Sequence, residues 1–299
     1  MNGGASHDPK TVREERPGER TTTVRKRFAG GRRRRVGAVE GASALLILLL
    51  LVAAVAPWLL APGDPLTIAP LDAFQRPSSD HPLGTDESGR DLYTRLVHGA
   101  APSLLIGVFA TVIGLSLGLV LGTAGGLGPR WVDAGTTRLV EVLFAFPGLL
   151  LALLFIVIAG PGPLTSTVAV GLATAPGYAR LVRTQVLAVR RSGYVESAIV
   201  LGRGWWRRVL RHILPNVGAT LFVLVTLGVG QSIVWASSLS YLGLGVSPPA
   251  AEWGAMLNAG RTYVGSFWWL TFFPGLAIVI AAASTTLLGR SLRQRMRTS

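Results

Sequence analysis

Long apolar runs alternate with short polar segments along most of this chain. Six runs approach the ~20 residues that a helix needs to cross the hydrocarbon layer of a bilayer. They lie near residues 42–61, 103–126, 139–160, 164–181, 217–237 and 267–289. The runs are continuous and lack the strict alternation that marks the strands of a membrane barrel. The pattern therefore predicts an all-α, polytopic membrane protein with about six transmembrane helices.

Three of the runs have distinctive small or helix-breaking residues. The fourth run is the most polar and contains Pro176, so hydropathy alone leaves open a buried or re-entrant segment. Pro147 in the third run and Pro176 in the fourth are expected to kink their helices. In the second run, glycines recur every four residues on one predicted helix face, where another helix can approach closely. These glycines are Gly114, Gly118, Gly122 and Gly126.

The distribution of charge predicts the topology. Of the 29 Lys and Arg residues, 25 lie in residues 1–41, 127–138, 178–216 and 290–299. Because positively charged flanks stay on the cytoplasmic side, both termini are predicted to be cytoplasmic. The net charge of +14 then reflects topology and contact with anionic lipid headgroups, and indicates no nucleic-acid partner. With 49% hydrophobic and only 15% charged residues, the composition excludes an ordinary soluble domain.

The same pattern divides the chain into three parts. Residues 1–41 are basic and lack hydrophobic periodicity, which predicts a disordered cytoplasmic tail. Residues 42–102 comprise the first transmembrane helix and an external loop, and residues 103–295 a core of five transmembrane helices with a cytoplasmic loop at 182–216. Residues 54–56 resemble a signal-peptide cleavage site, and Pro57 follows them directly. The further runs favour an uncleaved anchor.

The sequence offers little evidence that the protein is an enzyme. Residues 114–118 match the G-x-S-x-G nucleophile elbow, but they lie inside a predicted membrane helix rather than at a strand–turn–helix. The chain has no cysteine and no nucleotide-binding or metal-ligand motif, so we expect no catalytic site, no metal and no cofactor of its own. The apolar cores hold almost no ionisable residue. Glu141 is the exception, expected at the cytoplasmic edge, so the energy source should lie in another chain.

The inner loop before the fifth run is the most informative segment. Residues 194–216 predict a short helix, a turn at Gly202 and Gly204, and a basic amphipathic helix that ends at Pro215. By composition alone, such a helix is typical of an interfacial lipid anchor.

The order of residues in this loop resembles the EAA loop of ABC importer permeases. The matching positions are Glu196, Ser197, Ala198, Gly202, His212, Leu214 and Pro215. Ser197 replaces the usual second alanine, and His212 replaces an aliphatic residue. The ending His212–Asn216 is similar to the peptide and nickel branch of the family. In that family the loop docks onto cytoplasmic ATPases.

Other stretches resemble the same branch, and together they extend the resemblance to roughly residues 42–295. They are residues 81–91, 144–147, 240–246 and 252–254. The resemblance implies the type I ABC importer permease fold in a bacterial inner membrane, with half of a translocation pathway for di- or oligopeptides. It also implies a homologous second permease, two ATPase subunits that bind the ATP, and an extracytoplasmic solute-binding protein. Nickel or another small solute is the alternative cargo.

Gln231 and Ser232 in the fifth run are the candidates for lining a pathway, because they offer hydrogen bonds without fixed charge. Helix–helix hydrogen bonding is the alternative role for both. Two other classes of protein stay open from the residues alone. One is a self-contained ion-driven carrier or channel, and the other is a membrane scaffold whose basic loop only binds lipid.

Overall fold

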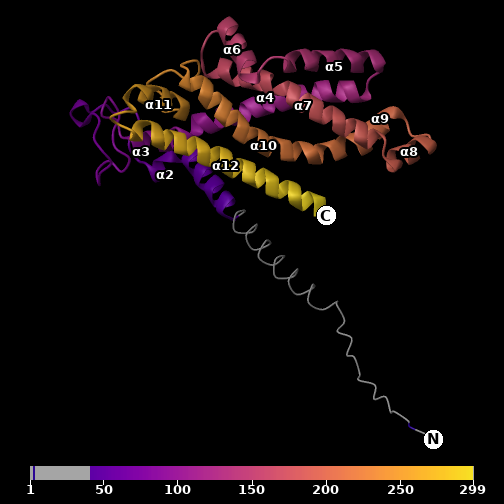
Figure 1. Ribbon diagram of the computed structural model, residues 1–299, viewed down its shortest axis with the longest axis horizontal. Helices are drawn as coiled ribbons and strands as arrows, with labels where there is room; N and C mark the ends of the chain where they lie inside the picture. Colours follow the sequence, from indigo (N-terminus) through magenta and orange to yellow (C-terminus); the bar gives the residue numbers. More distant parts are fainter. Residues whose placement is uncertain (1–2, 4–40, 299) are drawn as a thin grey trace.

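The computed structural model describes residues 3 and 41–298, and these form a helical bundle (Figure 1). An apolar helix, Gly41–Val55, comes first. The following elements are α2 (Pro57–Leu60), η1 (Pro70–Asp72), α3 (Leu92–His98), α4 (Ala100–Leu127), α5 (Arg130–Phe144), α6 (Gly148–Ala159), α7 (Pro163–Arg190), α8 (Gly193–Val200), α9 (Trp205–Arg208), the π-turn η2 (Val209–Ile213), α10 (Leu214–Tyr241), α11 (Trp253–Gly260), η3 (Arg261–Tyr263) and α12 (Trp269–Thr298). The predicted tail lies outside the described residues, except for Gly3 and Gly41.

Three helices of the described part are long and apolar enough to cross a membrane: Leu92–Leu127, Val223–Tyr241 and Trp269–Ser291. A bent pair of helices, α5 and α6, would be a fourth span if counted together. Each of the six predicted apolar runs contains helix, so the all-α prediction is confirmed. The first run is a shorter apolar helix, and the fourth falls within α7, whose 28 residues include several arginines.

The third run is not the single helix that hydropathy predicts. The chain turns by 90° between Arg130–Phe144 and Gly148–Ala159. Pro147 lies at this break and precedes the first residue of α6. Proline has no N–H to donate and disfavours helical geometry in the residue before it, so the helix cannot continue through this point. The expected kink at Pro147 is confirmed.

The fourth run is a continuous helix, and the glycine face of the second run explains why α7 lies so close to α4. A Cβ added at Gly114 would lie 2.4 Å from Thr174 Oγ1, and one at Gly118 would lie 2.4 Å from Tyr178 Cβ. At Gly122 and Gly126 the nearest atoms would be 2.6 and 2.5 Å away, again on α7. The predicted close helix contact is therefore confirmed, and it is made within this chain.

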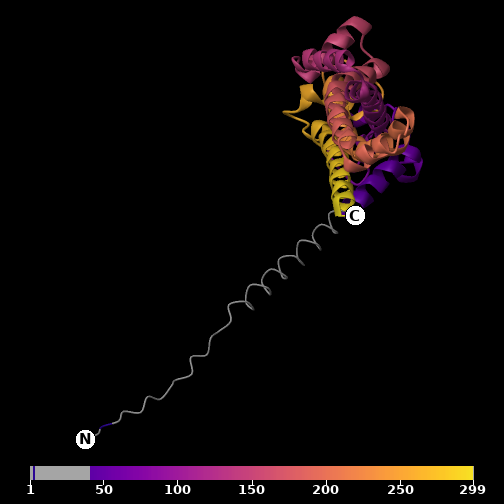
Figure 2. The same cartoon turned by 90° about the vertical axis from the view of Figure 1, so that its right-hand side faces the viewer.

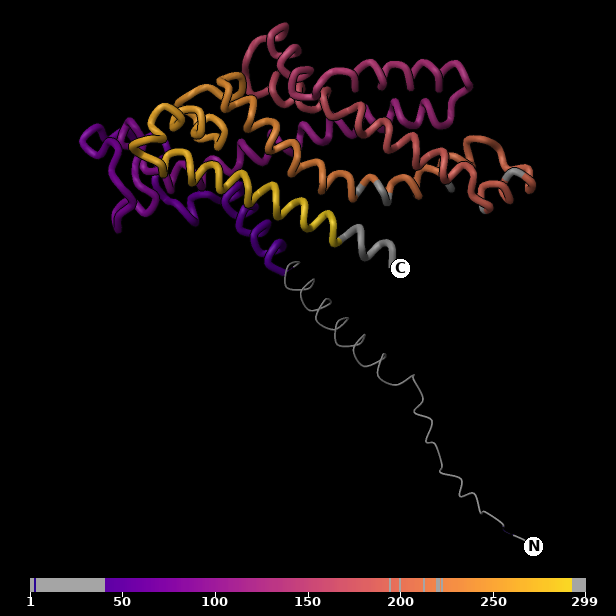
Figure 3. Tube along the Cα trace, viewed as in Figure 1, coloured from indigo at the N-terminus to yellow at the C-terminus, as the bar shows by residue number. Residues whose placement is uncertain are grey.

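The remaining elements lie along the bundle or at its two opposite ends. Helix α10 contacts α4, α7 and α12, and Figure 3 follows it between α7 and α12. The segments predicted to be external, around α2, α3 and α11, gather at one end of the long axis in Figure 1. The loop of α8 and α9 lies at the opposite end. Figure 2 views the bundle turned by 90°, with α5 and α6 to one side of it.

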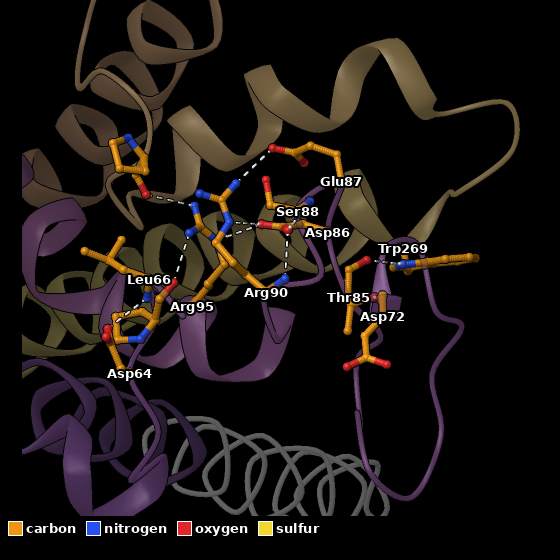
Figure 4. Close-up of polar contacts among 12 residues, drawn as sticks. Asp64, Leu66, Asp72, Thr85, Asp86, Glu87, Ser88, Arg90, Arg95 and Trp269 are labelled. Carbon is orange, nitrogen blue, oxygen red and sulfur yellow. Dashed lines mark hydrogen bonds and ion pairs between the residues drawn. The ribbon is translucent and has the colours of Figure 1, made fainter. Parts of the chain in front are cut away.

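A buried ion cluster holds the external segment to the bundle (Figure 4). The carboxylate of Asp86 accepts a hydrogen bond from Arg90 Nε at 2.7 Å and lies 3.4 Å from Arg95 Nε. Arg95 also donates to the carbonyl oxygens of Pro65 at 3.1 Å and Pro249 at 3.2 Å. Three separate stretches of the chain thus meet on one guanidinium. Asp86 therefore has a structural pairing role.

Glu252 fixes α11 at the same end. Its buried carboxylate accepts hydrogen bonds from the backbone N–H groups of Gly254 and Ala255, each at 2.9 Å, and caps the helix. Burial raises the pKa of Glu252, and these N–H donors act in the opposite direction. Trp253 Nε1 donates to the carbonyl oxygen of Leu96 at 2.9 Å, which ties α11 to α3. Residues 252–254 are therefore a packing motif.

Candidate functional site

The loop between α7 and α10 forms the helix, turn, helix that the sequence predicts. Helix α8 is followed by a turn in which the backbone of Gly202 lies in the left-handed region, at φ +67°. The N–H of Arg203 donates to the carbonyl oxygen of Ala198 at 3.1 Å, which is the closing bond of a Schellman motif. Glycine suits this position because a side chain is strained at positive φ. Nothing lies within 4 Å of an added Cβ there, so the requirement is conformational.

The inner face of the loop is attached to α7 by aliphatic side chains. Val195 on α8 and Val209 and Ile213 on η2 are each no more than 5% exposed. They pack with Val182 and Val186 of α7 in one buried cluster. Because such interiors are close-packed and resist deformation, the loop and the end of α7 form one packed unit.

The outer face of the loop is apolar and exposed. Its large side chains retain between 46% and 87% of their accessible surface. They are Val200, Leu201, Trp205, Trp206 and Leu210. The rings of Trp205 and Trp206 are in edge contact, with centroids 4.7 Å apart. Several exposed large apolar side chains in one short loop, with exposed arginines among them, are typical of a partner or membrane interaction site.

The residues of the EAA-like pattern occupy both faces. Ala198 is buried at 4% exposure, whereas Glu196 and Ser197 are exposed, and the Ser197 hydroxyl donates to the carbonyl oxygen of Gly193 at 2.8 Å. Leu214 and Pro215 are exposed at the start of α10. His212 belongs to the π-turn, and its side chain lies outside the described residues.

The second helix of the loop differs from the regular amphipathic helix that the sequence predicts. It contains the π-turn Val209–Ile213 directly before Pro215, whose missing N–H interrupts the regular ladder. Trp205 is expected to share a face with Val209 and Ile213, yet it is 46% exposed while both of the others are buried.

The two pathway candidates have different surroundings. Gln231 is exposed and lines a cleft of about 320 Å³ together with Phe146, Thr174 and Trp235. Ser232 is fully buried, and the hydroxyl of Thr111 on α4 donates to it at 3.0 Å. Ser232 therefore has the alternative role, a helix–helix hydrogen bond, and it does not line the cleft. Gln231 alone is carried forward as a pathway candidate.

A second cleft of about 250 Å³ lies nearer the loop, between α5 and α7. Phe144 lines both clefts, and charged side chains line only the second: Glu141, Arg180 and Arg183. Arg183 is held by Asp133 through two hydrogen bonds of 2.6 and 2.9 Å. Sequence reasoning missed Arg180 and the Asp133–Arg183 pair, because the paired residues are 50 positions apart and share no motif.

Comparison with known proteins identifies the family. Residues 114–298 match the family described as the binding-protein-dependent transport system inner membrane component. The chain belongs to this family. The permease is 41% identical over 220 residues to the glutathione transport system permease protein GsiD of Pectobacterium atrosepticum, covering 74% of this chain and 73% of the relative. It is 38% identical over 250 residues to the di/tripeptide transport system permease protein DppC of Pseudomonas aeruginosa, with 82% of each covered.

The fold has a solved relative. A chain of the inward-facing MetNI methionine ABC transporter is similar with a TM-score of 0.56 and 19% identity, covering 67% of this chain and 95% of that chain. The predicted type I ABC importer permease fold is confirmed. The permease is a multi-pass membrane component of a transport system and not an enzyme. Family membership implies ATPase and solute-binding partner proteins.

Proposed function

We propose that this permease carries di- or oligopeptides across the bacterial inner membrane as half of the pathway of an ATP-driven importer. A homologous second permease supplies the other half. Two cytoplasmic ATPase subunits bind the ATP, and an extracytoplasmic solute-binding protein delivers the peptide. Support for a peptide cargo comes from the names of relatives, which include di/tripeptide and glutathione transport systems.

The exposed apolar face of the loop is the observation that carries this proposal. An apolar surface rimmed by arginines suits a groove on a partner protein, and the buried valines beneath it attach it to α7. We infer that Glu196, Ser197, Ala198, Gly202, His212, Leu214 and Pro215 form the ATPase-coupling element. Closure of the ATPase dimer pushes this element, and α7 then moves relative to α5 as a rigid body. Both clefts between these helices change shape as a result.

Topology and domain limits belong to the same proposal. The coupling loop and both termini face the cytoplasm, because the segments rich in Lys and Arg lie there. Residues 1–41 form the basic tail, 42–102 the first span with the external loop, and 103–295 the core. The external end, with its ion cluster, then faces the solute-binding protein. Gln231 offers a neutral amide to peptide groups in the pathway.

The first test is purification of the tagged permease from its own cells in mild detergent, with mass spectrometry of the bound proteins. We expect a second permease and ATPase subunits in the eluate, and ATP-dependent dipeptide uptake after reconstitution with the solute-binding protein. Nickel uptake instead of peptide uptake would show that the cargo is nickel, and the proposed importer function would stand. A chain that is recovered alone and moves solute with an ion gradient would refute the importer and support a carrier.

A further inference from the structure

Two clefts lie next to each other along α5 and α7. The cleft lined by Gln231 and the cleft lined by Arg180 have volumes of about 320 and 250 Å³. Phe144 at the end of α5 lines both clefts, so they meet at this residue. Helix α7 supplies residues to both walls as well, among them Tyr178 in the first and Ala179 in the second. The second cleft therefore adjoins the first on the side of the loop between α7 and α10.

The two clefts differ in charge. The first is lined by aromatic rings, small residues, one threonine and the amide of Gln231, without a charged side chain among its described lining. The second contains Glu141 and two arginines. Asp133 already satisfies Arg183 through its paired hydrogen bonds. Arg180 is exposed and takes part in no ion pair in the described part of the chain. One free cation and one carboxylate thus share a cleft.

Glu141 is also available to a ligand. Its only ion pair among the described residues is with Arg138, at 3.5 Å, and these side chains are 59% and 80% exposed. An exposed pair of this kind contributes little to stability, so a ligand ammonium can replace the arginine at little cost. A guanidinium binds a carboxylate through charge-assisted, two-pronged hydrogen bonds, which are stronger than neutral ones.

On these grounds, and resting on the proposed importer function, we infer that the second cleft is a subsite for the charged ends of a zwitterionic peptide. Arg180 binds the terminal carboxylate and Glu141 the terminal ammonium. The first cleft holds the uncharged part of the peptide against Phe144 and Gln231. Charged groups are costly to place in a membrane interior without partners, and this subsite supplies one partner of each sign where the peptide leaves the apolar region.

The chain has no cysteine, which allows a direct test by thiol labelling. Thr137 lines the second cleft, whereas Ala134 on the same helix is exposed and lies outside its lining. Thr137→Cys and Ala134→Cys are each placed in the full complex with its ATPases and partner permease, with any thiols of the partners replaced. The rate of maleimide labelling is measured with dialanine, and with dialanine whose ends are blocked by acetyl and amide groups.

We expect dialanine to slow labelling of Thr137→Cys several-fold, and the blocked peptide to have no such effect. Labelling of Ala134→Cys should be unchanged by either peptide. Adding Arg180→Gln or Glu141→Gln to Thr137→Cys should abolish the protection while the complex still assembles. Equal protection by the blocked peptide would overturn the inference, as would protection that survives both substitutions.

The same preparation separates the two proposals. ATP-dependent dialanine uptake without any protection of Thr137→Cys refutes the subsite and leaves the importer intact. Failure of the wild-type complex to take up any peptide refutes the peptide-importer function, and the inferred subsite is refuted with it.

Discussion

Gly118→Ala is the sharpest test of how α4 and α7 are held together. The added Cβ would lie 2.4 Å from Tyr178 Cβ, 2.9 Å from the backbone nitrogen of Ala179 and 3.0 Å from the backbone carbon of Tyr178. Ordinary contact begins at 3.4 Å. Two of these neighbours are backbone atoms, so no rotamer change relieves the contact, and the helices must separate by about 1 Å. Neighbouring contacts of the same glycine face would loosen with them.

The expected size of the effect follows from two opposing terms. Overpacking of a close contact costs about 1–3 kcal/mol. Alanine is favoured over glycine inside a helix by about 0.8–1.0 kcal/mol, which offsets part of that cost. Gly135→Ala on α5 is the matched control, because nothing lies within 4 Å of an added Cβ at that position. We expect Gly118→Ala to lower stability and Gly135→Ala to leave it unchanged or raise it slightly.

The assay is heat inactivation of the detergent-solubilised permease, followed by size-exclusion chromatography of the protein that stays monodisperse. A lower midpoint for Gly118→Ala than for wild type, with Gly135→Ala at or above wild type, supports the reasoning. Equal midpoints for the two variants would refute it, because the close approach of α4 and α7 would then not depend on the missing side chain.

Five further substitutions probe other contacts, one of them as a control. Asp86→Asn removes the carboxylate that Arg90 and Arg95 share and leaves Arg90 paired with Glu87, so we expect a loss of about 3–5 kcal/mol of stability, seen as faster proteolysis of the external segment; unchanged digestion would contradict this. Gly202→Ala meets open space but costs roughly 1–2 kcal/mol at positive φ, so membrane insertion should persist while solute-stimulated ATP turnover in the complex falls. Gly204→Ala, with φ −57°, is its control, and equal turnover in both variants would remove the coupling role of the turn. Gln231→Ala should change the rate or the preference of peptide uptake, whereas Ser232→Ala should cost about 1 kcal/mol of stability with an unchanged uptake profile; the reverse result would exchange their roles.

Much of the fold follows from local and periodic features of the sequence. Apolar runs of membrane length predict helices because a backbone in lipid must satisfy its own hydrogen bonds. Glycines spaced by four predict a close helix contact because that spacing places them on one face. The turn at Gly202 follows from the need for positive φ at the end of a helix. The order of the short motifs also identifies the family, since several of them occur in sequence along most of the chain.

Tertiary packing decided what these local features could not. Gln231 and Ser232 are neighbours in sequence, but with 3.6 residues per turn they point in different directions. The positions of α4 and α7 decide that Gln231 lines a cleft and that Ser232 accepts a buried hydrogen bond. Pro147 marks a break, whereas its 90° angle depends on the helices around it.

The charged cleft is the clearest case of a feature beyond the reach of the sequence. Asp133 and Arg183 meet although they are 50 residues apart, and among the described residues that line this cleft Arg180 is then the cation without an ion pair. The sequence determined that this chain is a membrane permease with a helix–turn–helix loop before its fifth apolar run, because those properties depend on composition and on spacing along the chain. The tertiary structure decided which side chains share a cavity, because that depends on contacts between helices distant in sequence.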